Sequence, residues 1–346
     1  MSLTASNLTF RFPKSPFLFN NLSLNLGKNQ IVGLFGINGA GKTTLLKLLS
    51  GLLFPTSGRC TVEDQDGHTL SVHDRQPSTL SDIVILPEQF DLPRMTATRY
   101  RDIYAPFYPR FDHELLTTLL AELDVTHSIE TITLDKLSYG QRKKFLIAFS
   151  IATGATYLLL DEPTNGLDIP SKSQFRRVLA RDIFQDRCVI ISTHQVRDLG
   201  QSIDHLLILH NHSIVLSESM DTLTQIFRMT RDIPASFGQT PSDQAPDSEF
   251  LYTEPILGGQ MILTARPSGS FSFRGDADAP LPGDENTDVR ESADSWEQAE
   301  PFDAEPFDAE PFDMEFFFNA VVSNTEAIRS VLQHHALQND ELQHRE

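Results

Sequence analysis

Short apolar runs alternate with helical patterns over roughly the first 220 residues of the chain. The runs predicted to be buried strands are 31–35, 83–86, 157–160 and 188–192. Helices are expected over 43–49 and 138–152, each following a turn that contains glycine. Near-continuous apolar strands separated by helices need cover on both faces, so the pattern predicts an α/β domain with a largely parallel sheet.

Two departures from this alternation add detail to the domain, which we expect to span 1–225. A mostly helical stretch at about 87–137 interrupts the strands and is interpreted as an inserted helical subdomain, with one helix expected over 113–123. Apolar runs on either side of Asn211 and His212 predict a β-hairpin that closes the domain.

The character of the sequence changes beyond residue 225, where Pro, Ser, Asp and Gly become frequent. We interpret this part as a linker at 226–249, a small β element at 250–273 with a Gly258-Gly259 turn, an acidic low-complexity linker at 274–314 and a helical segment at 315–346. Within the acidic segment, Glu-Pro-Phe-Asp-Ala repeats recur, and a proline at every fifth position sustains neither a helix nor a central strand. Ser323 and Glu326 fit a capping box, which predicts a helix starting there.

Charge divides the chain in the same way. The formal net charge is −19, yet residues 1–230 hold 23 acidic and 22 basic residues. Residues 231–346 hold 24 acidic residues and only 6 basic ones. Because clustered Lys and Arg hold nucleic-acid phosphates, this balance argues against a nucleic-acid partner. The first part is therefore expected to be the globular domain that carries the chemistry.

Cysteine usage and hydropathy both favour a cytoplasmic protein. Cys60 and Cys188 stand far apart and form no C-x-x-C pair, which predicts free thiols rather than a disulfide framework or a zinc site. No basic segment followed by an apolar run opens the sequence, and no stretch reaches the ~18 consecutive apolar residues of a membrane span.

A phosphate-binding loop stands directly between a predicted strand and a predicted helix. Its sequence is Gly36-Ile37-Asn38-Gly39-Ala40-Gly41-Lys42-Thr43, which fits G-x-x-x-x-G-K-[ST]. Glycines let backbone N–H groups surround phosphate oxygens, and the helix N-terminus adds a favourable dipole. Lys42 is expected to reach the β- and γ-phosphates, and the Thr43 hydroxyl is expected to bind Mg²⁺.

A second element supports a nucleotide site. The apolar strand predicted at 157–160 ends in Asp161 and Glu162. Burying Asp161 is costly without a cation, and nucleotide-bound Mg²⁺ supplies one. Glu162 points elsewhere because side chains alternate along a strand, which suits it to polarise a water for attack on the γ-phosphate.

A third element narrows the family. Leu137-Ser138-Tyr139-Gly140-Gln141 resembles the LSGGQ signature of the ATPase subunits of ABC transporters, with Tyr139 at the first glycine position. Other family marks follow in order: the segment 165–168 resembles the D-loop, and Ser192-Thr193-His194 resembles the switch histidine. Phe12 stands where the family has an adenine-stacking aromatic residue, and 86–89 stands at the Q-loop. Several short motifs in order form a specific combination.

The resemblance covers about 1–220 and implies a P-loop NTPase of the ABC type, with a β-rich N-terminal part and an inserted helical subdomain. It implies ATP and Mg²⁺ as ligands, Glu162 and His194 as catalytic residues, and Thr43, Gln89 and Asp161 as Mg²⁺ ligands. Either Glu88 or Gln89 can fill the Q-loop role, with Gln89 slightly favoured. The implied nucleotide-binding residues are Phe12, Gly36, Asn38, Gly39, Ala40, Gly41, Lys42, Thr43, Thr44, Ser138, Gly140, Gln141 and Asp168.

The family also implies partners. Two ATP molecules are sandwiched between two ATPase subunits, each capping the nucleotide of the other with its signature. The work is delivered to a separate integral membrane permease, with 87–137 as the docking region and the ATPase bound peripherally to the inner face of the cell membrane. Segments 107–112 and 137–144 look most like bacterial exporter-type subunits, which implies export.

Two other interpretations remain. One is a soluble ABC-type ATPase that acts on ribosomes or chromosomes. A single ATPase domain with an acidic extension, and only about 95 residues between P-loop and signature, count against it, because no long coiled coil fits in that space. The other treats 231–346 as a regulatory or interaction module; the more common alternative for such a composition is a solvated linker.

Overall fold

The computed structural model describes residues 2–63, 67–125, 131–199, 202–232, 249–257, 259–266 and 311–343. The chain forms two compact units. The main unit comprises Met1–Thr224 and Met314–Arg329, and the second unit comprises Gln225–Asp313 and Ser330–Glu346.

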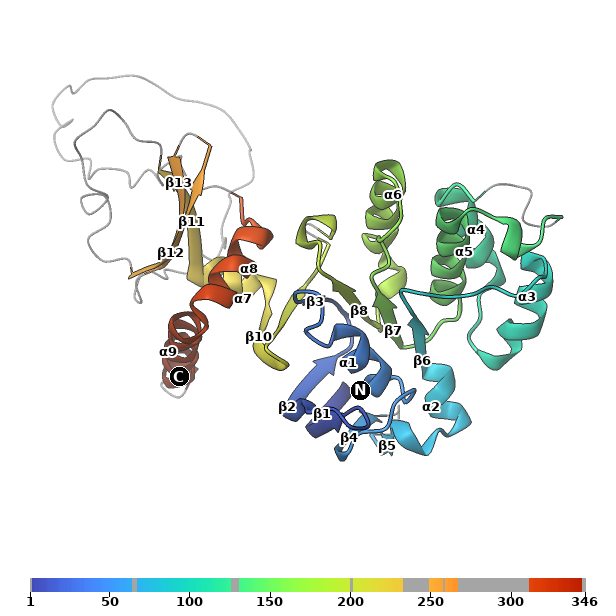
Figure 1. Ribbon diagram of the computed structural model, residues 1–346, viewed down its shortest axis with the longest axis horizontal. Coiled ribbons are helices and arrows are strands. Elements are labelled where there is room, and N and C mark those ends of the chain that lie inside the picture. Colours follow the sequence, from blue (N-terminus) through green and yellow to red (C-terminus); the bar gives the residue numbers. More distant parts are fainter. Residues whose placement is uncertain are drawn as a thin grey trace, which may run out of the picture. The chain divides into compact units, whose positions relative to one another are not determined.

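A six-stranded sheet forms the centre of the main unit, in the order β10-β9-β3-β8-β7-β6 (Figure 1). Its strands are β3 (Gln30–Phe35), β6 (Ile83–Leu86), β7 (Tyr157–Asp161), β8 (Cys188–Thr193), β9 (His205–His210) and β10 (Ser213–Ser219). Every neighbouring pair from β9 to β6 is parallel, and β10 returns antiparallel to β9. The predicted parallel α/β sheet and its closing hairpin are both confirmed.

An antiparallel sheet forms the N-terminal part, in the order β2-β1-β4-β5. Its strands are β1 (Ser2–Arg11), β2 (Phe17–Gly27), β4 (Ser57–Glu63) and β5 (Thr69–Ser71). Buried and less buried residues alternate along β1, as expected for a sheet with one face in the core.

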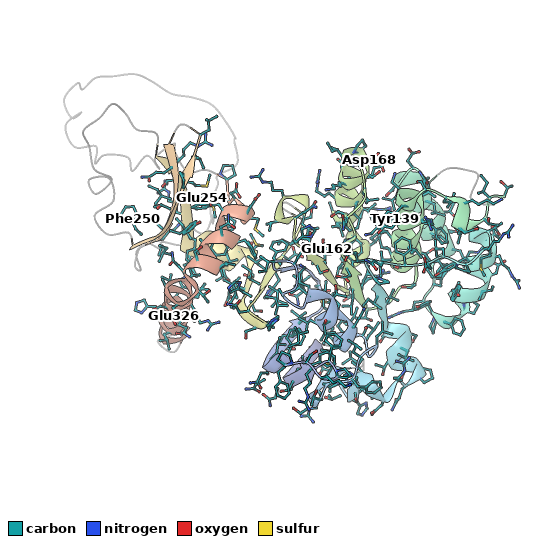
Figure 2. All side chains as sticks on the ribbon, viewed as in Figure 1. Tyr139, Glu162, Asp168, Phe250, Glu254 and Glu326 are labelled. Atoms are coloured by element: carbon teal, nitrogen blue, oxygen red, sulfur yellow. The ribbon has the colours of Figure 1, made fainter. Side chains whose placement is uncertain are left out.

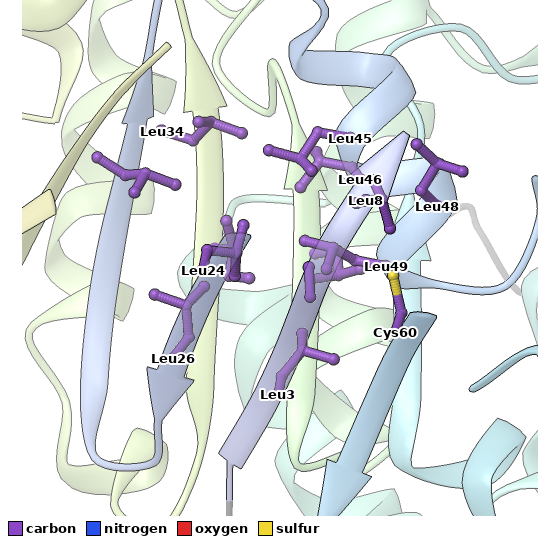
Figure 3. Close-up of a cluster of buried hydrophobic side chains, with 14 of the residues drawn as sticks. Leu3, Leu8, Leu24, Leu26, Leu34, Leu45, Leu46, Leu48, Leu49 and Cys60 are labelled. Carbon is purple, nitrogen blue, oxygen red and sulfur yellow. The ribbon is translucent and has the colours of Figure 1, made fainter. Parts of the chain in front are cut away.

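Helix α1 (Lys42–Leu49) joins the cores of the two sheets. Its leucines, including Leu45 and Leu49, belong to one buried cluster with Leu3 of the antiparallel sheet and Leu34 of the parallel sheet (Figure 3). Each buried leucine stabilises the fold by about 1.5–3 kcal/mol relative to an exposed one. The helix that begins at Lys42 is therefore held in a fixed position between two sheets.

The remaining described helices of 1–226 are α2 (Pro77–Asp82), α3 (Ala97–Tyr104), α4 (His113–Glu122), α5 (Tyr139–Ala152), α6 (Ile169–Leu179) and α7 (Met220–Ile226), with 3-10 turns at Val72–Asp74, Ala105–Phe107, Leu134–Lys136, Asp182–Phe184 and Val196–Asp198. Of these helices, α3, α4 and α5 lie in the predicted helical regions, whereas α2, α6 and α7 were not predicted. Tyr100 of α3, in the predicted subdomain 87–137, packs edge-on against Phe145 and Phe149 of α5, which follows that stretch, with ring centroids 5.4 and 5.1 Å apart. No helix of the described residues is long and apolar enough to cross a bilayer.

The second unit contains a three-stranded antiparallel sheet in the order β11-β13-β12. β12 (Glu249–Ile256) and β13 (Gly259–Ala265) form the β element that the sequence predicts, while Gly258 and 267–273 lie outside the described residues. β11 (Phe227–Asp232) corrects the predicted linker 226–249. Its six residues become a strand because they pair with β13, far along the chain. The rest of that linker, 233–248, is outside the described part.

Two helices follow the acidic repeats, of which 274–310 lie outside the described residues: α8 (Met314–Ser323) and α9 (Thr325–Gln343). α8 belongs to the main unit, which the sequence did not predict. Phe317 is fully buried, Glu315 forms an ion pair with Arg197, and Arg329 donates to the Val215 carbonyl oxygen at 3.3 Å. Residues from beyond the acidic segment therefore pack against the domain that precedes it.

Gly36 links β3 to the loop before α1 in a space that admits no side chain. A Cβ at Gly36 would lie 2.6 Å from the Leu209 carbonyl oxygen, on the adjacent strand β9. We expect Gly36→Ala to lower the free energy of unfolding by about 1–3 kcal/mol, seen as a lower midpoint in urea. Gly27→Ala is the control, because its nearest neighbour, the Gln30 side-chain nitrogen, would lie 3.8 Å away. Equal midpoints for the two variants would contradict this account.

Candidate nucleotide-binding site

The predicted phosphate-binding loop leaves β3 and turns into α1. Gly39 and Gly41 have φ angles of 85° and 109°, a region that glycine enters without steric cost. The Lys42 ammonium group donates to the Gly36 carbonyl oxygen at 2.8 Å, so its side chain lies back across its own loop. His212, in the turn between β9 and β10, contacts the Ala40 carbonyl oxygen through Nδ1 at 3.1 Å. The loop is thus supported from a second element.

Asp161 is the last residue of β7 and is 1% exposed. Its carboxylate accepts hydrogen bonds from the Thr43 hydroxyl at 2.8 Å and from the Ser192 hydroxyl at 2.5 Å. Mg²⁺ is usually held by one or two carboxylates together with waters and substrate phosphates, all oxygen ligands. The Thr43 hydroxyl beside the Asp161 carboxylate fits that donor set, at the N-terminus of the helix that follows the loop.

Glu162, labelled in Figure 2, follows directly. It is 5% exposed. Its Oε1 accepts from the His194 backbone N–H at 3.0 Å, lies 2.9 Å from His194 Nδ1 and lies 3.6 Å from Lys42 Nζ. Burial lowers the pKa of Lys42, and the charges of Glu162 and Asp161 act in the opposite direction. Lys42, Glu162 and His194, which are far apart in sequence, therefore meet at the Glu162 carboxylate.

The loop after β6 places Glu88, and not Gln89, beside these groups. The Glu88 carboxylate accepts from Asn165 Nδ2 at 2.8 Å, and its charge acts against the burial that lowers the pKa of Lys42. Gln89 is exposed. This geometry favours Glu88 over Gln89 for the Q-loop role. The strand ends at Leu86, and the direction of the side chains after it depends on the loop.

The signature residues are held by the first turn of α5 and its neighbours. The Ser138 hydroxyl caps the helix by accepting from the Gln141 N–H at 3.2 Å. Gln141 Nε2 donates to the Asp124 carbonyl oxygen at 3.2 Å, and Gly140 lies near Gly166. No hydrogen bond recorded for the side chains of Ser138 or Gln141, both in the described part of the chain, reaches the phosphate-binding loop.

The other expected nucleotide-binding residues include Phe12, Asp168, Asn38 and Thr44. Phe12 is 44% exposed and packs edge-on against Phe10, with ring centroids 4.9 Å apart. Asp168 caps α6 by accepting from the Ser171 N–H at 3.0 Å, and hydrogen bonding by Ser171 lowers its pKa. Asn38 is exposed on the loop, and Thr44 lies in the first turn of α1.

Comparison with known proteins identifies the family. The family model described as "ABC transporter" matches residues 19–165. The lipopolysaccharide export system ATP-binding protein LptB of Haemophilus influenzae is 31% identical over 202 residues, which are 57% of this chain and 81% of LptB. The chain belongs to the family of ABC transporter ATP-binding proteins. Its domain therefore binds ATP and hydrolyses it.

Two further ABC proteins extend the comparison. The cobalt import ATP-binding protein CbiO of Salmonella typhi is 31% identical over 231 residues, which are 62% of this chain and 79% of CbiO. A dimeric bacterial ABC transporter cassette has a TM-score of 0.53 and 19% identity, covering 63% of this chain and 98% of the cassette. At that identity, the structural match supports the fold alone.

Two side chains of this ABC domain, Ser192 and Lys143, contact the charged cluster although their motifs assign them no role. In the sequence, Ser192 stands out only as a neighbour of His194, and Lys143 only as part of the signature helix. Lys143 is fully buried on α5, where most of the other buried residues are apolar. A lysine on the buried side of this helix is the signal that could have indicated a specific role for it. Burial lowers the pKa of Lys143 to about 8, while Glu88 and Glu162 act in the opposite direction.

We expect Lys42→Ala to weaken ATP binding by tenfold or more, because it removes the ammonium group beside the phosphate-binding loop. The measurement is a titration with ATP in the absence of turnover, at 4 °C without divalent cation. Lys47→Ala, in the last turn of the same helix, is the matched control. Equal ATP affinity in the two variants would exclude Lys42 from phosphate binding.

We expect Glu88→Ala to lower ATPase turnover at least about tenfold, because it removes the carboxylate that contacts Asn165 and faces Lys42. Gln89→Ala is the control, since Gln89 is exposed, and it is expected to stay within about twofold of the parent. Steady-state phosphate release as a function of Mg²⁺ concentration measures both. The reverse ranking would return the Q-loop role to Gln89.

Proposed function

We propose that this chain is the ATP-hydrolysing subunit of an ABC transporter, that it dimerises around two ATP molecules, and that it drives a separate membrane permease for export. The observation that carries the catalytic part is the meeting of Lys42, Glu162 and His194 at one carboxylate oxygen. Such a cluster supplies positive charge for a phosphoryl group and a base for water at the same point.

Each residue has a proposed part in hydrolysis. Lys42 and the N–H groups of its loop hold the β- and γ-phosphates. Thr43 and Asp161, with Glu88, hold Mg²⁺, which neutralises charge on the phosphate oxygens. Glu162 orients a water for in-line attack on the γ-phosphate, and His194 contacts that phosphate.

Dimerisation is supported by where the signature lies. Ser138, Gly140 and Gln141 open α5, a helix N-terminus suited to an anion, while the N-terminus of α1 already serves the phosphates of the same chain. In the proposed dimer, the signature of one subunit caps the ATP held by the other, and the exposed Asp168 and Phe12 complete the nucleotide contacts. ATP then binds the closed dimer more tightly than the open one, and hydrolysis reverses this shift.

The permease is proposed from family membership. The exposed side chains of Tyr104 and Phe107, within the predicted helical stretch, support a docking face there. Export rests on the likeness of 107–112 and 137–144 to exporter-type subunits; relatives include proteins named for export and for import. The proposed location is the inner face of the cell membrane, as a peripheral subunit.

We expect Glu162→Gln to lower turnover by at least about a hundredfold while leaving ATP affinity within about threefold, because the amide keeps the shape but not the basicity of the carboxylate. The variant is also expected to accumulate as an ATP-bound dimer in size-exclusion chromatography. Glu114→Gln, at an exposed position of α4, is the control. Ordinary turnover in Glu162→Gln would remove Glu162 from the proposed role.

Partner identity is tested with the same trapped variant. Affinity purification of Glu162→Gln from detergent-solubilised membranes, with ATP and Mg²⁺, is expected to recover an integral membrane protein in stoichiometric amount. Recovery of ribosomes instead would favour the soluble ATPase and overturn the transporter proposal.

A further inference from the structure

Lys143 is a charged residue with no exposed surface, one turn into the signature helix α5. Its ammonium group donates to the Glu162 carbonyl oxygen and, at 3.2 Å, to the Asn165 carbonyl oxygen. Burying an ammonium group is costly, and an apolar residue of similar size avoids that cost. Because this cost is accepted, we expect the hydrogen bonds of Lys143 to serve a function at the turn that follows β7.

That turn carries an unfavourable backbone conformation. Glu162 has a φ of 47°, in the left-handed region that is unfavourable for a residue other than glycine. Such a conformation persists only where the surroundings hold it. The Glu162 N–H donates to the Ser192 carbonyl oxygen at 3.0 Å, and its carbonyl oxygen accepts from the Asn165 N–H at 3.2 Å and from Lys143. The direction of the Glu162 carboxylate depends on these bonds.

Tyr139, the departure from the family signature, contacts the same turn and also the loop after β6. Its hydroxyl donates to the Glu88 carbonyl oxygen at 3.0 Å. Its ring lies so close to Gly166 that a Cβ there would be 2.7 Å from the ring. Lys143, four residues along the helix, lies over the Tyr139 ring at 5.7 Å from its centroid, a cation–π contact.

The contacts close into one network within a single chain. Asn165, whose carbonyl oxygen accepts from Lys143, donates through Nδ2 to the Glu88 carboxylate at 2.8 Å. Glu88 in turn carries the carbonyl oxygen that binds Tyr139. The side chains of Tyr139, Lys143 and Asn165 thereby link the start of α5, the loop after β6 and the turn after β7.

We infer that Tyr139 and Lys143 are a positioning pair that holds the Glu162 turn and the Glu88 loop in the arrangement that ATP hydrolysis requires. The inference rests on the proposed role of Glu162 in orienting water. Neither residue touches the reacting atoms; both act through the backbone of residues that do. Through this pair, a movement of the start of α5 displaces Glu162 and Glu88 in the same subunit.

Three variants of the full chain test the pair. Lys143→Met keeps the unbranched stem and removes the donors, Lys143→Gln keeps a shorter, neutral donor, and Tyr139→Phe removes the hydroxyl alone. We expect Lys143→Met to lower kcat at least about tenfold with ATP affinity within about threefold. Lys143→Gln is expected to recover part of that loss, because a donor for the carbonyl oxygens remains. Tyr139→Phe is expected to lower kcat about threefold or more.

The double variant Lys143→Met/Tyr139→Phe tests whether the two residues act together. Groups that act as a unit give losses that do not multiply, so we expect its kcat within about twofold of Lys143→Met alone. Steady-state phosphate release gives kcat and KM, and titration with a non-hydrolysable ATP analogue gives affinity. Lys136→Met, at an exposed position just before the signature, is the matched control.

Four results would overturn the inference: a kcat for Lys143→Met equal to that of Lys136→Met, an equal fall in kcat and ATP affinity, no recovery in Lys143→Gln, or losses that multiply in the double variant. If Lys143→Met does not fold, control-like kcat values for both Lys143→Gln and Tyr139→Phe overturn it. The Glu162→Gln variant distinguishes a failure of the proposed role of Glu162 from a failure of the positioning pair. Turnover in Glu162→Gln removes the proposed role of Glu162, whereas an inactive Glu162→Gln beside a fully active Lys143→Met removes the positioning pair alone.

Discussion

Two buried carboxylates at the end of an apolar strand impose the main constraint on this domain. Asp161 and Glu162 are almost without exposed surface, and such charges are tolerated only where hydrogen bonds and opposite charge surround them. Their partners are Thr43, Ser192, Lys42 and His194, contributed by α1, by β8 and by the residues next to it. These elements meet only because β3 and β7 flank β8, with Asp161 paired to Ser192 in register. The order of the strands in the sheet is therefore what brings the partners of the two carboxylates together.

Local pattern predicted the parts of the molecule that local interactions decide. The apolar runs became strands, and the glycines before Lys42 adopt the left-handed angles that their motif implies. The outcome differs where a residue depends on distant partners. β11 becomes a strand through β13, and Glu88 rather than Gln89 faces the charged cluster because the loop after β6 turns it toward Asn165. The motif locates the Q-loop in the sequence. Which of its side chains, Glu88 or Gln89, lies beside the charged cluster depends on the packing of the folded chain.

The departures from ordinary protein chemistry gather around the same turn. A glutamate in left-handed backbone geometry and a lysine without exposed surface each lower stability, and they contact each other. Cores rarely retain such features where an apolar residue would serve, whereas active sites often do. Tyr139 adds an aromatic ring where the family signature has a glycine. The contacts that this ring makes with the turn after β7 therefore depend on a residue that departs from the signature.

The packing of α8 changes the meaning of the acidic region. Met314–Arg329 belongs to the same compact unit as Met1–Thr224, so this unit is built from two stretches that stand far apart in the sequence. Most of the excess acidic residues therefore stand, in the sequence, between the two stretches of this unit and not after them. A chain cut once within that region would remain one particle, held together by the burial of Phe317 and its neighbours. A chain ended before it would lose part of the domain itself.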